Sequence, residues 1–263
     1  MNMSDTNNKS MFTFKYAYDP DNQRTVITDG KCTPNSSYFN GLFESIKNLQ
    51  LGKKVHFTGT PTFSNFNIGN LSDVNSDGTT TFTFEHPIFK NCNFLGNRVT
   101  NFGRSGSSFE NCNMFDSTWE DCTFSFSHTF TNCNLRSSNI SLNTKKRFGH
   151  VMFEKCDLRD AKVEVTDKLN PDEKSAGYYF FKKCSLKNTD MSNCDFSEDK
   201  VDFQNCDITN TNFNGCVIGE LNPHYGNPIF RWKFLMRGGK IVKDIGYTDG
   251  VASWLGKKLG YFE

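Results

Sequence analysis

Residues 109–124 read FENCNMFDSTWEDCTF, and in this stretch a large apolar residue recurs at every fifth position. Each of its two cysteines stands two residues before one of these large residues. A period of five fits neither the 3.6-residue turn of an α-helix nor the two-residue repeat of a β-strand. The spacing therefore predicts a solenoid with five-residue faces, turns at its corners and coils stacked about 4.8 Å apart.

The same spacing extends over most of the chain. Nine of the ten cysteines have a large apolar residue three positions before them and another two positions after them, as in FKNCNF (89–94), FEKCDL (153–158) and FQNCDI (203–208). A buried cysteine behaves as a small hydrophobic residue, so one large and one small side chain per five residues would fill a narrow interior. Asn, Asp, Ser or Thr usually precedes the second large residue, and these side chains hold turns by hydrogen bonds to the backbone.

This repeat resembles the pentapeptide-repeat family, whose motif is roughly A(D/N)Lxx, over about residues 82–220 and more loosely from Val55. The resemblance implies a mainly β fold, a right-handed quadrilateral β-helix with four pentapeptides per coil. It implies that the central inward position is held by Phe94, Met114, Phe124, Leu135, Leu158, Leu186, Phe196, Ile208 and Ile218. The small inward position, usually alanine in the family, would be held by Cys92, Cys112, Cys122, Cys133, Cys156, Cys184, Cys194, Cys206 and Cys216.

The chain divides into three expected segments. Residues 1–54 are expected to form an N-terminal cap, because alternation over residues 11–30 predicts a β-hairpin and the apolar spacing over 36–49 predicts an amphipathic helix. This helix either packs on the first coil or mediates dimerisation. Residues 55–220 are expected to form the solenoid, and residues 221–263 a basic, aromatic C-terminal extension or capping helix.

The C-terminal extension is the predicted interaction site. Residues 221–263 hold seven Lys+Arg against three Asp+Glu, a net charge of +4. Tryptophan and arginine are favoured at the centres of protein interfaces, which suggests a segment that docks on another subunit. The other interpretation is a terminal cap with a solvated basic face. The candidate interaction residues are Arg231, Trp232, Lys233, Trp254, Lys257 and Lys258.

No residue pattern indicates catalysis or a bound cofactor. The five histidines are scattered outside any nucleophile motif, and the glycine motifs that bind phosphates or dinucleotides are absent. Cysteines in one column of a solenoid spread along an axis, whereas zinc needs four ligands around one point. Residues 1–10 are polar and show no export signal, so reduced thiols are expected. We predict a protein that is not an enzyme and holds neither cofactor nor metal.

Charge narrows the range of expected partners. The chain carries 30 Lys+Arg and 29 Asp+Glu, and this net charge of +1 argues against direct nucleic-acid binding. No apolar run approaches the roughly 18 residues of a membrane span, so a location in the cytoplasm or within an assembled viral particle is expected. A rigid solenoid with polar faces favours a protein partner, in a homo-oligomer or a larger assembly. The abundance of Phe and Asn fits a structural subunit of a phage or viral particle.

The alternative function is mimicry of DNA. Some pentapeptide-repeat proteins imitate the duplex and bind type II topoisomerases such as gyrase, which requires a strongly negative face. Residues 85–220 hold 16 Lys+Arg and 19 Asp+Glu, a net charge of −3 that is small beside the one charge per about 1.7 Å of a duplex. The insertions Asn143–His150 and Thr166–Tyr178 either resemble loops that project from those relatives or are surface loops that the fold tolerates. A continuous acidic stripe would favour the mimic.

Overall fold

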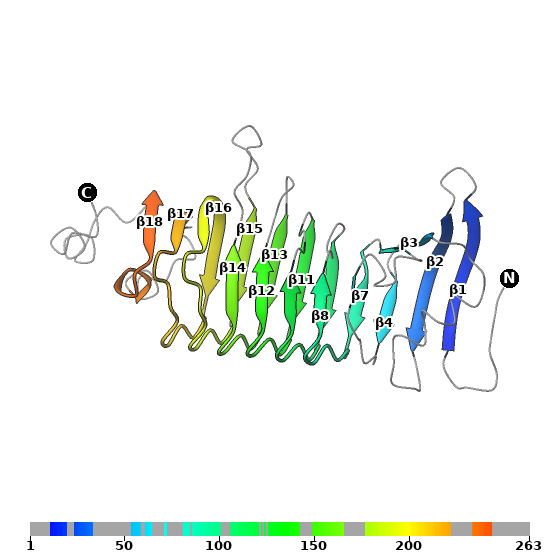
Figure 1. Cartoon of the computed structure of the whole chain (residues 1–263), viewed down its shortest axis with the longest axis horizontal. Coiled ribbons are helices and arrows are strands. Elements are labelled where there is room, and N and C mark those ends of the chain that lie inside the picture. Colours follow the sequence, from blue (N-terminus) through cyan, green and yellow to red (C-terminus); the bar gives the residue numbers. More distant parts are fainter. Residues whose placement is uncertain are drawn as a thin grey trace.

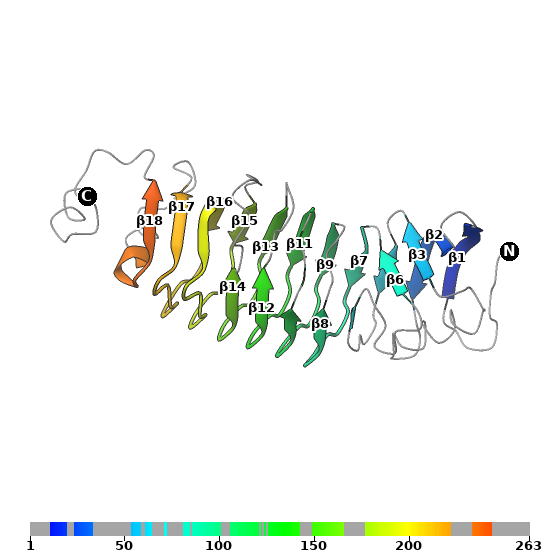
Figure 2. The same cartoon turned by 45° about the horizontal axis from the view of Figure 1, so that its top comes forward.

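The structure, a computed structural model, shows an elongated stack of short strands with the N-terminal strands at one end and β18 at the other (Figures 1 and 2). It describes residues 11–19, 24–33, 54–58, 61–64, 71–72, 81–84, 86–100, 106–120, 122, 124, 126–142, 149–165, 177–221 and 233–243. Within these residues the chain is almost entirely β-structure, as the five-residue repeat predicts. The fold is a quadrilateral β-helix.

The N-terminal strands β1 (Met11–Asp19) and β2 (Arg24–Thr33) form the antiparallel hairpin expected from the alternating pattern, with Asp19 paired to Arg24. The hairpin belongs to the stack, because β2 also pairs in parallel with β3 (Lys54–Thr58) and β4 (Thr62–Ser64). The helix predicted over residues 36–49 lies outside the described residues.

Parallel pairing between coils builds two sheets. The 13-stranded sheet runs β18-β17-β16-β15-β13-β11-β9-β7-β4-β2-β3-β6, with β1 beside β2, and the 5-stranded sheet runs β14-β12-β10-β8-β5. The remaining strands are β5 (Leu71–Ser72), β6 (Thr81–Phe84), β7 (Ile88–Lys90), β8 (Arg98–Thr100), β9 (Ser107–Glu110), β10 (Thr118–Glu120), β11 (Ser127–Thr131), β12 (Asn139–Leu142), β13 (His150–Glu154), β14 (Lys162–Val165), β15 (Tyr178–Lys182), β16 (Asp195–Gln204), β17 (Val217–Leu221) and β18 (Lys240–Lys243).

Three faces follow one another along successive described coils, and a fourth is described in the coil that contains β16. The first face is the stack of β4, β7, β9, β11, β13, β15 and the last five residues of β16. The second face is held by isolated parallel bridges, as between Asn113 and Asn134, and the third by the 5-stranded sheet. On the fourth face the start of β16 pairs with the start of β17, and the end of β17 pairs with Lys200 and Val201 on the first face. β18 pairs with β17 in turn.

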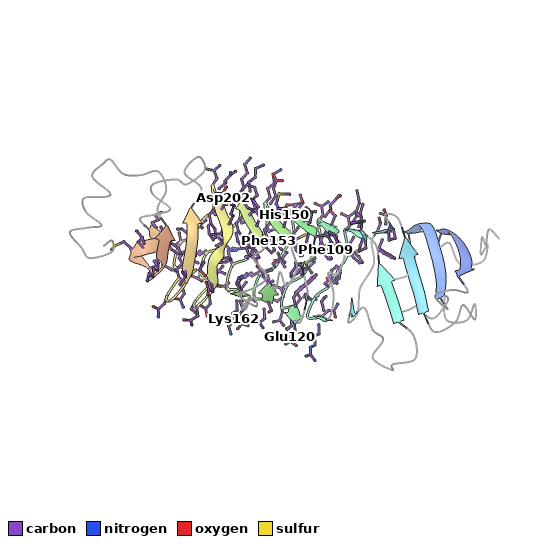
Figure 3. All side chains as sticks on the ribbon, turned by 90° about the horizontal axis from the view of Figure 1, so that it is seen from above. Phe109, Glu120, His150, Phe153, Lys162 and Asp202 are labelled. Carbon is purple, nitrogen blue, oxygen red and sulfur yellow. The ribbon has the colours of Figure 1, made fainter. Side chains whose placement is uncertain are left out.

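Phenylalanine lines the inside of the first face from one coil to the next. Neighbouring rings lie 4.8 to 5.2 Å apart between centroids and are tilted by only 7° to 20°. Parallel in-register strands impose this stacking, because equivalent side chains repeat at the strand spacing. Figure 3 shows Phe109 and Phe153 inside the ribbon. The column consists of Phe63, Phe89, Phe109, Phe130, Phe153, Phe181 and Phe203.

A column of thiols lies beside the rings, at the turn into the second face. Each sulfur atom lies 3.2 to 3.5 Å from the carbonyl oxygen of the phenylalanine one coil earlier and donates a hydrogen bond to it. The thiol therefore fills a small space and bonds to the neighbouring coil. The column consists of Cys92, Cys112, Cys133, Cys156, Cys184 and Cys206, all unbridged.

The corner between the first and second faces, which we call the first corner, needs a left-handed backbone. Its residues have φ between 52° and 56° in every coil from 91 to 205. Asparagine tolerates this conformation better than other residues with a side chain, and it occupies four of the six positions. The amide of Asn132 also donates to Asn111, 2.8 Å away, which links the coils. The six residues are Asn91, Asn111, Asn132, Lys155, Lys183 and Asn205.

The stack continues past residue 220, the end predicted from the repeat. Residues 233–236 form a helical turn in which Phe234 is buried, with its ring centroid 4.9 Å from that of Phe213. β18 then pairs with β17, and Ile241 lies opposite Ile218. The helical turn interrupts the five-residue spacing, which is why the sequence pattern ends before the sheet does.

Candidate protein-interaction surface

The outward side chains of the first face change character along the stack. Ser108 and Thr129 are small and polar, and their hydroxyl oxygens lie 2.9 Å apart in a hydrogen bond. The same column then carries Met152 on β13 and Phe180 on β15, which are paired neighbours and half-buried. Ile88 is the other apolar member. The whole column is Thr62, Ile88, Ser108, Thr129, Met152, Phe180 and Asp202.

The adjoining outward column is aromatic in the same two strands. His150 pairs with Tyr178, and their ring centroids lie 5.9 Å apart at 69°. Tyr178 in turn stacks on Phe180 with a centroid distance of 6.1 Å. We call His150, Met152, Tyr178 and Phe180 the β13–β15 patch. Figure 3 shows His150 on one side of the solenoid, whereas Lys162 and Glu120 lie on the opposite side.

The same two coils also break the rule of the first corner. Lys155 and Lys183 stand where the coils on either side carry asparagine, with φ of 56° and 55°. Both side chains are exposed, and neither forms an ion pair with another described residue. We call them the corner lysines. A bulky side chain at a left-handed position is unfavourable, so the backbone at these two lysines lowers stability. Each lysine also places an exposed positive charge at the corner.

Several charges of opposite sign on the described faces are paired. On the first face Lys90 lies 3.0 Å from Glu110, and Lys182 lies 3.3 Å from Glu154. On the third face Lys162 lies 2.5 Å from Glu164, and Arg98 pairs with Glu120. Over the described residues of the first three faces, acidic and basic side chains are therefore mixed, and no continuous acidic stripe forms.

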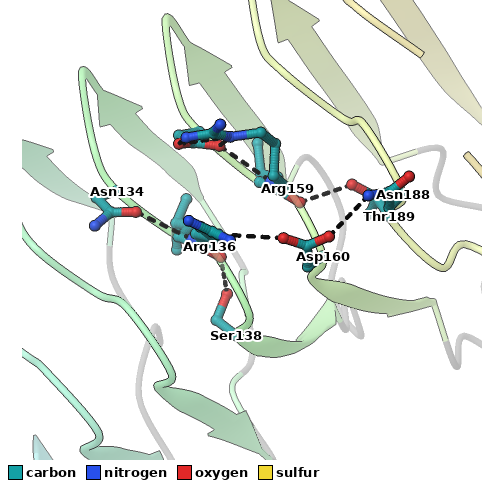
Figure 4. A network of polar contacts seen from close by, with 10 residues as sticks. Asn134, Arg136, Ser138, Arg159, Asp160, Asn188 and Thr189 are labelled. Carbon is teal, nitrogen blue, oxygen red and sulfur yellow. Dashed lines mark hydrogen bonds and ion pairs between the residues drawn. The ribbon is translucent and has the colours of Figure 1, made fainter. Parts of the chain in front are cut away.

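The second face holds a small polar network, drawn in Figure 4. Arg136 lies 3.1 Å from Asp160, whose other carboxylate oxygen accepts from Asn188 at 3.0 Å. The Asn188 amide and the Arg136 guanidinium together hold the pKa of Asp160 below its usual value. In the same coil Arg159 binds both oxygens of Asp157 and lowers the pKa of that carboxyl. These pairs tie neighbouring coils and turns together.

Among its described residues, the first face carries one buried acid. Asp202 occupies the outward position beside Phe180, yet it is only 1 % exposed. Burial raises the pKa of this carboxyl, although Gln204 donates to it at 3.2 Å. Its charge therefore costs stability at neutral pH instead of adding a free acidic group to the surface.

Comparison with known proteins agrees with the repeat geometry. Residues 181–222 match the family model described as pentapeptide repeats (9 copies). This chain is a pentapeptide-repeat protein. No curated protein matches its sequence. The assignment rests on this match and on the five-residue spacing of the buried columns.

Solved structures of QnrB1, whose titles describe a plasmid-mediated fluoroquinolone resistance protein, are also similar to this pentapeptide-repeat protein. Two trypsin-treated forms are each 15 % identical to it, with TM-scores of 0.30 and 0.29, and cover 80 % and 78 % of this chain and 97 % of their own. The full-length form is 17 % identical with a TM-score of 0.22, over 79 % of this chain and 90 % of its own.

The predicted core residues lie inside the pentapeptide-repeat solenoid. The large residues from Phe94 to Ile218 and the cysteines are buried, and Cys206 alone among them is only partly buried. Burial raises the pKa of the Cys194 thiol to about 12. Among the described residues no cluster of three His, Cys, Asp or Glu side chains could hold a metal, and no described helix is long and apolar enough to span a membrane.

The structure places only one of the predicted interaction residues. Lys233 is exposed at the start of the helical turn over 233–236. The others, Arg231, Trp232, Trp254, Lys257 and Lys258, lie outside the described residues, so the C-terminal interaction site stays a prediction. Sequence reasoning missed the β13–β15 patch. Its signal was present in YYFFK (178–182), where large residues fill the outward positions as well as the inward ones.

Proposed function

We propose that this pentapeptide-repeat protein is a non-catalytic, rigid scaffold whose first face binds another protein through the β13–β15 patch. The observation that supports the proposal is the coincidence of two departures in the same two coils. Met152 and Phe180 replace small polar side chains on the outside, and the corner lysines replace asparagine. Both changes leave the inner columns intact, and so neither serves the packing of the solenoid.

Rigidity suits this role. Every described coil is bonded to the next on several faces, and the buried columns repeat without a break from Phe89 to Phe203. A surface that is ordered before binding loses little conformational entropy on association. Apolar side chains that are half-buried beside charged residues have the arrangement of an interface centre with a polar rim.

A site-specific photocrosslinker tests the proposal in cells that produce the protein. Benzoylphenylalanine in place of Met152 is expected to give an adduct of one defined mass, and the adduct is expected to weaken in a Phe180→Thr background. The matched position is Ser141 on β12, which is outward on the third face. Equal adducts from both positions, or none from position 152, would contradict a binding site on the first face.

Two further functions were expected from the sequence. The ion pairs on the described faces give no support to a DNA mimic. A gyrase supercoiling assay at micromolar protein tests this function. Loss of supercoiling would favour mimicry, and no effect would exclude it. A subunit of a viral particle, or a cytoplasmic scaffold, fits the proposed role equally. Light scattering would separate a large assembly from a monomer that needs a different partner.

A further inference from the structure

We infer that the partner of the β13–β15 patch is an acidic protein segment with an apolar anchor: the anchor packs on Met152 and Phe180, and its carboxylates reach the corner lysines. The inference rests on the proposed function and specifies the chemistry of its partner. The structural basis is the position of Lys155 and Lys183 immediately after the strands that carry the patch.

The anchor site is the apolar row that crosses the two strands. Met152 and Phe180 are paired across β13 and β15, and Tyr178 stacks on Phe180 from the next outward column. Together they form a compact apolar surface between the polar Thr129 and the buried Asp202. A single large apolar side chain of a partner would cover this area, as anchor residues do at interface centres.

Among the described residues beside the patch, the exposed charges that form no ion pair are basic. Glu154 and Lys182 lie beside it but neutralise each other at 3.3 Å. The corner lysines are exposed and form no ion pair with another described residue. A partner that matches this rim carries carboxylates. An acidic group of the partner is attracted to the corner lysines, whereas a basic group is repelled by them.

The spacing of the corner lysines from the apolar row suits an extended partner segment. Lys155 and Lys183 lie in successive coils, because the amide of Lys155 donates to the carbonyl of Lys182 at 2.8 Å, directly before Lys183. From Phe180 to Lys183 the chain advances three residues, about 10 Å in an extended strand. An extended partner segment would therefore place its acidic residues three to four positions away from its apolar anchor.

The backbone conformation at these lysines indicates that lysine is present there for a reason other than stability. Asparagine at the first corner bonds to its neighbour in the column, as Asn132 does to Asn111, and adopts the left-handed conformation at lower cost. Two adjacent coils lack both the asparagine hydrogen bond and the lower backbone cost. They carry two exposed cations beside the apolar row instead. Departures from the rule of a repeat that cluster in this way are expected at functional sites.

Fluorescence anisotropy with defined peptides tests the inference on the full chain. The probe is a fluorescein-labelled ten-residue peptide with one Trp and two Glu placed three and four positions after it. We expect it to bind more tightly at 50 mM than at 300 mM salt. The Lys155→Asn/Lys183→Asn variant is expected to weaken binding about three- to tenfold, and Met152→Thr/Phe180→Thr at least tenfold.

The chain offers matched controls for each change. Asn is the residue of the same corner in neighbouring coils and Thr that of the same outward column at Thr129, so both variants are expected to fold, which urea unfolding checks. Lys187→Asn removes an exposed lysine from the second face and is expected to leave binding unchanged. A peptide with Gln in place of both Glu residues is the matched ligand control.

The outcomes separate this inference from the proposed function. Equal binding of the Glu and Gln peptides, or no effect of the corner lysine variant, would overturn the acidic partner but keep an apolar binding site. Crosslinking from position 152 to a second copy of this chain, with a dimer in sedimentation, would also overturn it. Failure of every peptide together with loss of the position-152 adduct would remove the proposed function as well.

Discussion

The thiol of Cys156 donates a hydrogen bond to the carbonyl oxygen of Phe130, one coil earlier, over 3.2 Å. The ring of Phe130 stacks on Phe153 in the coil of Cys156, with centroids 4.8 Å apart and planes 14° from parallel. Backbone, ring and thiol of adjacent coils thus join at one place, and the same arrangement recurs along the first face. This junction explains why cysteine and phenylalanine recur together in the sequence.

Removal of one ring from the middle of the stack is expected to destabilise the solenoid strongly. Phe130 is 1 % exposed and contacts rings on both sides, so Phe130→Ala should lower the free energy of unfolding by about 3–5 kcal/mol. The control is Phe126→Ala, because Phe126 is 52 % exposed and should change stability by less than about 0.5 kcal/mol. Urea unfolding measures both, and similar losses would contradict a stacked core.

The buried thiols are expected to resist modification in the folded protein. In a Cys32→Ser background, which removes the one cysteine outside the repeat, an aromatic disulfide reagent at pH 8 should react slowly. Burial raises the pKa of Cys194 to about 12, which leaves almost no thiolate at that pH. Cys206, only partly buried, should react first, and the rest only on unfolding. Rapid reaction of several thiols in the native protein would show that the interior is open.

Replacement of a corner lysine by asparagine is expected to stabilise the protein. Lys155→Asn places the preferred residue at φ 56° and lets its amide donate to Asn132, so the free energy of unfolding should rise by about 0.5–1 kcal/mol. The reverse change, Asn132→Lys, should lower it by a similar amount. Thermal unfolding of the two variants gives the comparison, and a loss of stability in Lys155→Asn would refute the assignment of a backbone cost.

Asp202 and Asp157 are expected to respond to pH in opposite ways. Because burial raises the folded-state pKa of Asp202, its contribution to stability is greatest at low pH and is lost as the pH rises through that pKa. Asp202→Asn should therefore raise stability at pH 7 and have little effect near pH 3. Arg159 lowers the pKa of Asp157, so Asp157→Asn should reduce stability at pH 7 and matter less as the pH falls through the folded-state pKa. Urea unfolding from pH 3 to pH 8 distinguishes the two.

The solenoid itself could be predicted because its inner columns follow a strict rule. Large residues such as Met114 and Leu158 must recur every five positions to fill the interior, so the period is present in the sequence itself. The end of the stack could not be placed in the same way. Phe234 fills its position from a helical turn, and Ile241 rejoins the sheet after an interval that no period describes.

The candidate site could not be predicted from the sequence for a different reason. Outward residues obey no packing rule, so Met152 and Phe180 carry no periodic signal that marks them as neighbours. They are 28 residues apart in the chain and become adjacent only when parallel pairing brings β13 beside β15. In sequence alone it is Trp232 and Trp254 whose aromatic and basic surroundings resemble an interface.

The amino-acid sequence by itself determined the solenoid, with its five-residue faces, its buried rings and thiols, and its polar corners. It did so because each coil must bury the same kind of side chain in the same place. Tertiary structure alone decided which outward residues of successive coils meet. The insertions that vary coil length leave the inner register unchanged, and only the pairing of coils sets Met152 against Phe180 and Lys155 beside Lys183.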